Sequence, residues 1–195
     1  MRLLAGLLLA CLIMALSRAE AEERLNVCFN YGCASQVEAV YDESKLHQLE
    51  TMFLEVVGAD GERIAISQGV GRMLGWAGEQ TPISADRGGN FADGAAYGRM
   101  DCIDHSTTTT RLLRMFEKRG WLRFHRVLEP ALRSRLLFFE HYAAQIEEKP
   151  VRMPRVADRE PRRYVVDSWF FDNGRPAVVM PLAAWLDWEG PNVDE

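Results

Sequence analysis

The sequence predicts an α+β fold in which helices come first and an antiparallel sheet follows. Apolar residues recur at helical spacing through residues 43–78. Segments typical of strands, joined by a turn signal, fill residues 164–180. A further helix is predicted to begin at Cys102, between these two regions. We therefore expect N-terminal helices followed by an antiparallel β-sheet that packs on the helix bearing Cys102.

The N-terminus has the pattern of a secretory signal. An arginine at the second position precedes an apolar stretch over residues 3–16, and small residues follow, including Ala19 and Ala21. This stretch is shorter than the ~20 residues of a membrane span. We expect residues 1–21 to be a signal peptide, cleaved after Ala19 or Ala21, and residues 22–195 to form a single periplasmic or secreted domain.

The charge balance argues against nucleic acid as a partner. The chain carries 23 Lys and Arg against 28 Asp and Glu, a formal net charge of −5 at pH 7. Nucleic-acid binding needs a basic surface, so we expect none. After the N-terminal stretch no segment approaches the apolar length of a bilayer span, so no stable membrane span is expected once the signal is removed.

Export places the cysteines in an oxidising compartment. Cys28 and Cys33 lie five positions apart and are expected to form a disulfide, with two free thiols as the alternative. Cys11 leaves with the signal peptide. Cys102 then has no partner, and an unpaired thiol in an exported protein is either a liability or a functional group.

The elements before Cys102 follow from periodicity. Ser35–Tyr41 is predicted to be a short strand, and Glu43–Val57 a helix. A second helix is expected from Ile64 to Gly78, after the break at Asp60-Gly61. Residues 79–100 are rich in glycine and show no periodicity. A loop of this length in a compact domain is often functional.

The helix that begins at Cys102 has recognisable ends. Asp101 suits the N-cap, Asp104 suits the first turn, close to a capping box, and Gly120 suits the C-terminal stop. Thr107–Thr110 has poor helix propensity, so we expect tertiary packing to hold this helix in a central, buried place. The N–H groups of a first helical turn stabilise a thiolate and can donate to an oxyanion. The two aspartates oppose the thiolate, which would therefore need an imidazolium nearby.

The second half is predicted to be an antiparallel meander. Leu136–Glu147 and Tyr164–Phe171 are expected strands, separated by a polar connection whose prolines exclude regular structure. Asp172-Asn173-Gly174 is a hairpin turn signal, and Ala177–Met180 is the expected return strand. A short helix is predicted within Pro181–Trp188.

Four histidines are candidates for the imidazolium. His47 is expected on the surface or in packing. His105 is too close to Cys102 along the helix to reach its thiol, so a structural role is favoured. His125 is possible. His141 is preferred because it begins a predicted strand, and strands hold a base more rigidly than loops do.

Asp167 completes the candidate site. It lies in an otherwise apolar strand, where a carboxylate is costly unless it is paired. Orienting His141 would explain it, because antiparallel neighbours would bring the two side chains together. The predicted catalytic residues are Cys102, His141 and Asp167. The alternative is an inert buried thiol among unrelated polar residues.

The order of cysteine at a helix start, histidine on a strand and aspartate on the next strand resembles a known family. It resembles the transglutaminase-like branch of the papain-fold thiol enzymes, in particular the exported bacterial transglutaminase-like cysteine proteinases. Their Gly-Asp-Cys-Glu-Asp, His-bearing strand and Leu-Asp-Asn strand are echoed by residues 100–104, 140–142 and 166–168. The resemblance covers roughly residues 97–180.

The resemblance implies a papain-like, transglutaminase-type core with Cys102 as nucleophile, His141 as general base and Asp167 as the orienting group. Ile103 stands where the family has a glutamate, one of the acidic residues that bind calcium in calcium-dependent members, which argues against calcium dependence. Ion binding by Asp101 and Asp104 is an alternative, but their roles as N-cap and first-turn charge are favoured. No metal and no cofactor are therefore expected. Gln80 lies in the loop before the cysteine, but it is not assigned to the oxyanion hole. Asn90, in the same loop, is not assigned to it either.

The predicted function is an exported thiol hydrolase, a cysteine peptidase or amidase, that acts by acyl transfer on a protein or peptide substrate of the cell envelope. An amine-accepting transglutaminase is one alternative. Another is a catalytically inactive transglutaminase-like binding or assembly factor, which would use the glycine-rich loop and the arginines of the polar connection as a partner surface. A solvated loop is the favoured interpretation of those arginines, Arg152, Arg155, Arg159, Arg162 and Arg163.

Overall fold

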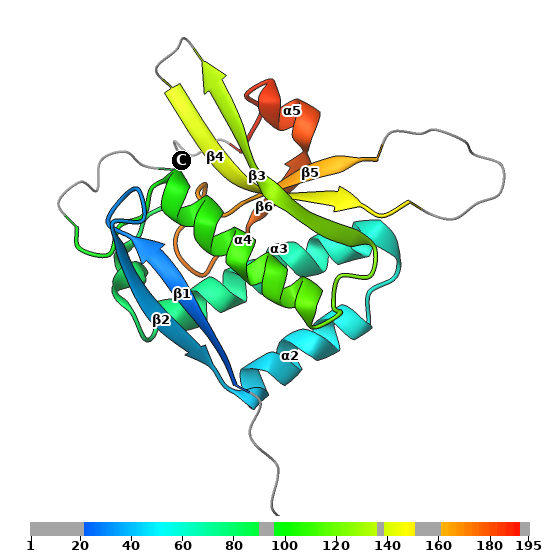
Figure 1. The fold of residues 1–195 in the computed structure, drawn as a ribbon, viewed down its shortest axis with the longest axis horizontal. Coiled ribbons are helices and arrows are strands. Elements are labelled where there is room, and N and C mark those ends of the chain that lie inside the picture. Colours follow the sequence, from blue (N-terminus) through cyan, green and yellow to red (C-terminus); the bar gives the residue numbers. More distant parts are fainter. Residues whose placement is uncertain (1–21, 90–95, 136–138, 151–160, 192–195) are drawn as a thin grey trace, which may run out of the picture.

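The computed structural model describes residues 22–89, 96–135, 139–150 and 161–191 (Figure 1). The predicted signal peptide, residues 1–21, lies outside these ranges. The described chain forms an N-terminal hairpin, then helices, and then a four-stranded antiparallel sheet. This arrangement confirms the α+β class. Within the described ranges no helix is long and apolar enough to cross a membrane.

The hairpin consists of β1 (Glu23–Phe29) and β2 (Ser35–Tyr41), paired antiparallel along their whole length. The prediction of β2 is confirmed, but β1 was not predicted, so the expectation that helices come first is wrong. The Cys28–Cys33 disulfide is present and joins the two ends of the hairpin tip, with Cα atoms 4.6 Å apart. This hairpin lies beside the helix that bears Cys102 (Figure 1).

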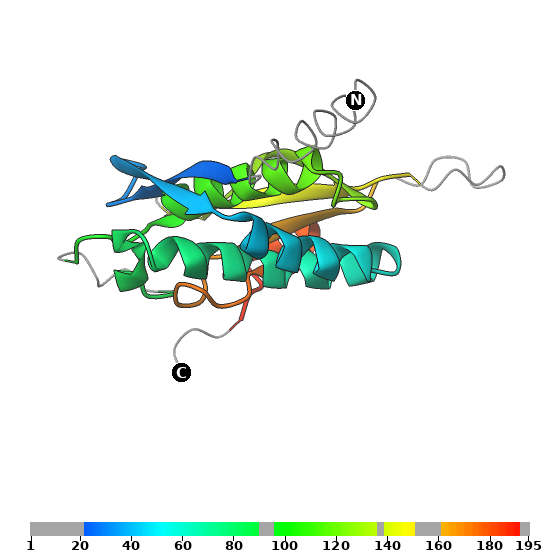
Figure 2. The ribbon, with the colours of Figure 1, turned by 90° about the horizontal axis from the view of Figure 1, so that it is seen from below.

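Two predicted helices are confirmed as α2 (Glu43–Leu54) and α3 (Gly58–Gly78). α3 begins at Gly58, earlier than the predicted start at Ile64. Asp60 and Gly61, which were expected to break the helix, lie in its first turn. The backbone N–H groups of a first turn have no intrahelical acceptor, so residues that break a helix interior are tolerated there. A short 3₁₀ helix, η1 (Pro82–Ala85), follows. Figure 2 shows α2 and α3 in one layer, with α4 and the hairpin in another.

Helix α4 (Cys102–Lys118) begins at the predicted residue. Asp101 is its N-cap and forms a complete capping box with Asp104. Thr108 and Thr109 are buried, as expected for a helix held by packing. α4 packs against β3, β4 and β5 and against β1, which confirms its central place (Figure 1).

The sheet has the order β3-β4-β5-β6, and each pair is antiparallel. Its strands are β3 (His125–Arg135), β4 (Phe139–Glu148), β5 (Arg163–Asp167) and β6 (Val178–Pro181), and α5 (Leu182–Leu186) follows. The last three strands and α5 confirm the predicted meander with shifted ends. β3 was not predicted. It contains a proline, which is accommodated where the pairing register shifts in mid-strand.

The two faces of the sheet have different neighbours. One face joins the main core together with α4, through Ala144, Ile146 and Val166. The other face carries a small cluster centred on α5, formed by Ala143, Val165 and Trp185. Successive side chains of a strand point to opposite faces, so His141 and Asp167 lie on the face that α5 covers.

Candidate active site

Cys102 is the first residue of α4 and is partly buried. Its Sγ lies 3.9 Å from the backbone oxygen of Glu140, on the neighbouring strand β4. The thiol is therefore neither sealed in the core nor fully exposed, and it lies beside the strand that carries His141. Among the described cysteines it is the one outside a disulfide.

Asp167 and His141 form a direct hydrogen bond. His141 Nε2 donates to Asp167 Oδ2 at 2.7 Å, and the Asp167 side chain is only 1% exposed. The same Oδ2 accepts the indole N–H of Trp185 at 3.1 Å, and Oδ1 accepts the backbone N–H of Trp169 at 3.1 Å. Three donors thus hold the carboxylate, which offsets the cost of its burial.

The environment of His141 favours the charged imidazole. Burial lowers its pKa, but hydrogen bonding and negative charge from Asp167 and Cys102 outweigh burial and raise the pKa to about 9. The imidazole is therefore an imidazolium at neutral pH. Since Nε2 is engaged with Asp167, Nδ1 is the ring nitrogen left for Cys102. Aromatic rings enclose the imidazole, with centroids 4.9–6.0 Å away: Trp169, Trp185 and Phe170.

The structure thus brings together Cys102, His141 and Asp167, which are far apart in the sequence. Each comes from a different element: the first turn of α4, strand β4 and the end of β5. Their catalytic roles remain predictions. The arrangement is that of a nucleophile, a base and a group that orients the base.

The raised pKa of His141 predicts a pH dependence of folding stability. A basic group with a folded-state pKa of about 9, against 6.5 for a free histidine, stabilises the fold fully below pH 6.5. The part of this contribution that Asp167 provides is lost as the pH rises through the folded-state pKa. It is measured by urea unfolding at pH 6.5 and 9.5 in Cys102→Ser, because ionisation of a thiol beside the imidazole would offset it in the wild type. Adding His141→Ala should make the difference between these pH values much smaller, and an unchanged difference would contradict the assignment.

One backbone donor is available at the N-terminus of α4. The Asp101 carboxylate accepts the N–H groups of Ile103 and Asp104, at 3.0 and 2.9 Å. Within the described residues this leaves the N–H of Cys102 without an acceptor, next to its own sulfur. Gln80 is used elsewhere, because its amide bonds to the backbone of β2 and to the end of α3. Asn90 lies outside the described residues.

Two other histidines are placed away from the thiol. His47 is exposed and lies 3.8 Å from Glu50 on the surface of α2. His125 is completely buried, and its Nδ1 lies 2.9 Å from Glu62 Oε1. The same carboxylate also accepts three backbone N–H groups at the start of β3. His125 is thus part of a structural link between α3 and the sheet.

His105 belongs to a buried network that sequence reasoning missed. Its Nε2 donates to Asp86 at 3.0 Å, and its Nδ1 lies 2.9 Å from the hydroxyl of Ser168. Asp86 also accepts the backbone N–H of Met100, just before α4, at 2.7 Å. The Ser168 hydroxyl is in turn 2.9 Å from that of Thr109. The network ties the loop before α4 to the helix and to the residue after β5, which supports the structural role expected for His105.

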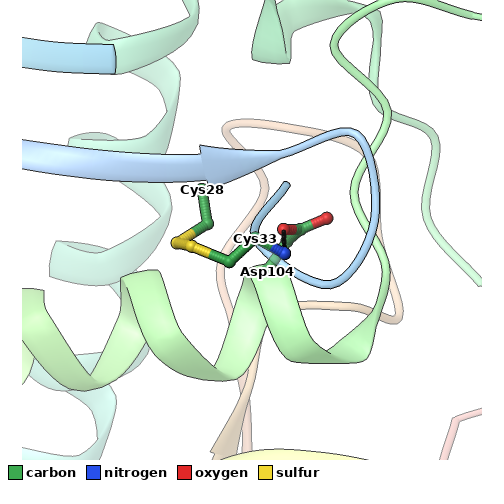
Figure 3. Close-up of side chains that lie close together, drawn as sticks. All are labelled: Cys28, Cys33 and Asp104. Carbon is green, nitrogen blue, oxygen red and sulfur yellow. Dashed lines mark hydrogen bonds between the residues drawn. A yellow bond between two sulfur atoms is a disulfide. The ribbon is translucent and has the colours of Figure 1, made fainter. Parts of the chain in front are cut away.

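Asp104 fixes the hairpin tip to the first turn of α4 (Figure 3). Its carboxylate accepts the N–H groups of Cys33 at 2.6 Å and Tyr31 at 2.8 Å. The N–H of Gly32 donates to the neighbouring Asp101 at 2.8 Å. Burial raises the pKa of Asp104 to about 6; the backbone N–H donors oppose this rise and the charge of Asp101 adds to it.

The same region is the metal-compatible cluster of the described residues: Cys28, Cys33 and Asp104 lie within 4.8 Å of one another. The two sulfurs form a disulfide, and the carboxylate is occupied by backbone N–H groups. A thiolate is the form of cysteine that binds metals, so these residues do not fit a metal site in the oxidised protein.

The arginines of the polar connection between β4 and β5 are only partly described. Arg152, Arg155 and Arg159 lie outside the described residues. Arg162 pairs with Glu148 at 2.6 Å, and Arg163 pairs with Glu147 at 2.8 Å. Ion pairs with the end of β4 thus occupy these two side chains.

Comparison with models of known protein families, with curated proteins and with solved structures finds no match for this chain.

Proposed function

We propose that this protein is an exported thiol hydrolase, a cysteine peptidase or amidase, whose nucleophile is Cys102. The observation that carries the proposal is the convergence of a half-buried thiol at a helix N-terminus with an imidazole that a buried carboxylate orients. The raised pKa of His141 supports an imidazolium beside Cys102 at neutral pH.

The proposed reaction is acyl transfer from an amide. The Cys102 thiolate attacks the carbonyl carbon, and the Cys102 N–H donates to the oxyanion that forms. The C–N bond then breaks as the His141 imidazolium gives its proton to the leaving nitrogen, and a thioester remains. Water attacks this thioester while His141 takes one of its protons. The carboxylic acid leaves, and the thiolate and imidazolium are restored. An amine in place of water would give a transamidation product.

The fold proposed for this chemistry is a papain-like, transglutaminase-type core. Its support is the chain order of the three residues and the packing of the Cys102 helix against the strands that carry His141 and Asp167. The N-terminal hairpin is an addition that the resemblance did not imply. The proposed substrate is a protein or peptide of the cell envelope, in keeping with the predicted signal peptide.

Alkylation by iodoacetamide tests the proposal without a known substrate. An ordinary thiol with a pKa of about 8.5 reacts more than about a hundredfold more slowly at pH 6 than at pH 8.5. We expect Cys102 to lose less than about tenfold over this range, because a thiolate paired with His141 persists at pH 6. Mass spectrometry of the labelled peptide measures the rate, and Cys102→Ser is the blank.

The opposite profile would favour the inactive assembly factor. If Cys102 alkylates slowly at pH 6 and speeds up only near pH 8.5, the thiol is ordinary and the hydrolase is excluded. If the acid profile is as expected, activity-based profiling of the envelope with wild type and Cys102→Ser identifies the acylated substrates. Addition of a primary amine then distinguishes hydrolysis from transamidation by the product formed.

A further inference from the structure

Arg133 is a buried cation next to the candidate active site. It lies on β3 directly opposite His141 in the strand register, and only 6% of its surface is exposed. Cross-strand partners share one face of a sheet, so Arg133 is on the face that α5 covers. No motif in the sequence indicated this position.

The hydrogen bonds and ring contacts of Arg133 link it to the segment around α5. Its Nη1 donates to the backbone oxygens of Trp185 at 2.8 Å and Glu189 at 3.2 Å. The guanidinium carbon lies 4.6 Å from the ring centre of Trp185 and 4.5 Å from that of Trp188. The side chain therefore binds the backbone at two points, Trp185 and Glu189, and stacks on two indole rings of the same segment.

Stability alone does not account for this arginine. Within the described residues it forms no ion pair with a carboxylate, and its Nε is buried without an acceptor. Burial lowers the pKa of Arg133, and the charge of Asp167 opposes this shift. Burying a cation without a carboxylate partner is costly, and apolar residues of similar volume often stabilise such a site more. The position therefore points to a role in the site beside it.

Trp185 connects Arg133 to the candidate catalytic residues. Its indole N–H donates to Asp167 Oδ2, the same oxygen that accepts His141 Nε2. Its ring centre lies 5.7 Å from the imidazole of His141. α5 is only five residues long, too short to hold its own geometry in water. The orientation of the indole must therefore be fixed by groups outside the helix.

We propose that Arg133 is a positioning residue for the proposed reaction: it clamps the α5 segment so that Trp185 holds the Asp167 carboxylate in line with His141. The inference rests on the proposed function. Arginine suits this task because its Nη1 donates to two backbone acceptors while the flat guanidinium stacks between aromatic rings, a planar contact that a lysine ammonium does not make. Arg133 thus holds the Trp185 segment, Trp185 holds the Asp167 carboxylate, and Asp167 orients His141.

Two ionisable groups act on the imidazole, Asp167 from β5 and Cys102 from α4. Arg133 lies opposite it on β3. In the described part of the chain, the contacts of the imidazole with α5 and with the segment after β5 are with aromatic rings. A looser Asp167–His141 bond should therefore lower the pKa of His141 from about 9 toward that of free histidine. NMR titration of the imidazole reads this change directly, apart from any effect on folding.

The test compares the pH 6 alkylation rate of Cys102 and the His141 titration in Arg133→Met, Trp185→Phe and the double variant. Arg135→Met is the matched control, because Arg135 is exposed two residues further along β3 on the same face. We expect Arg133→Met to slow alkylation at least about tenfold, per folded molecule, through misplacement of the base. Trp185→Phe should have a similar effect, and the double variant should be little worse than either single one. Arg133→Lys should not restore the rate.

The outcomes separate this inference from the proposed function. If the wild type shows ordinary thiol reactivity, the proposed function fails first. If the wild type is reactive at pH 6 but Arg133→Met matches Arg135→Met, the function stands and the clamp is overturned. Additive losses in the double variant, or full rescue by lysine, would also overturn it. Should Arg133→Met fail to fold, Trp188→Leu removes one stacking face and must give a smaller loss of the same kind.

Discussion

Replacing His141 with alanine is expected to slow alkylation of Cys102 at pH 6 by about a hundredfold, because the thiol then loses its counter-charge and behaves as an ordinary cysteine. The α4 N-terminus remains in the variant, but the nearby Asp101 and Asp104 carboxylates oppose a thiolate there. The reaction at pH 9 should change little, since most ordinary thiols are ionised at that pH. Rates measured by mass spectrometry from pH 5 to pH 9.5 give the full profile.

Two histidine variants serve as controls. His125→Ala removes a buried histidine that binds Glu62, and His47→Ala removes an exposed one. Both should keep the acid reactivity of Cys102 once the rate is corrected for the folded fraction. If His141→Ala keeps the wild-type alkylation profile, or if only His125→Ala loses the reactivity at pH 6, His141 is not the base.

The helices could be predicted because their apolar residues repeat with a clear period. α2, α3 and α4 each place buried residues at helical spacing, and Asp101 marks the start of α4 through local capping chemistry. Strand β3 could not be predicted in the same way. Its sequence carries charged residues along much of its length and a proline in the middle, and its identity as an edge strand depends on pairing with β4.

The core of the candidate site could be predicted because each residue has a local anomaly. Cys102 is an unpaired thiol at a helix start, and Asp167 is a carboxylate in an apolar strand. Asp86, Ser168 and Arg133 have no such signal. Their importance comes from contacts between residues far apart in the chain, such as Asp86 with His105 and Arg133 with Trp185. Only the folded backbone brings these partners together.

Removing the disulfide with Cys28→Ser and Cys33→Ser is expected to lower the free energy of unfolding by about 2 kcal/mol, the chain-entropy estimate for so short a loop. The hairpin tip adds a second cost, because it holds several non-glycine residues at positive φ, including Tyr31 at 67° and Cys33 at 56°. Without the crosslink the tip should relax away from Asp104. Urea unfolding measures the first effect, and faster hydrogen exchange at the Tyr31 N–H measures the second.

The reactivity of Cys102 shows whether the disulfide only stabilises the hairpin or also supports the active site. The tip donates N–H groups to Asp104 and Asp101, the two residues of the capping box that begins α4. Asp104→Asn is the matched variant, because it keeps the disulfide but offers one oxygen where two N–H groups need acceptors on separate oxygens. If the tip supports the first turn, both changes should reduce alkylation of Cys102 at pH 6, although only the serine variant loses the crosslink. In Asp104→Asn the loss must outweigh the removal of a negative charge that opposes the thiolate. A serine variant that is less stable yet keeps the full acid reactivity would restrict the disulfide to holding the hairpin.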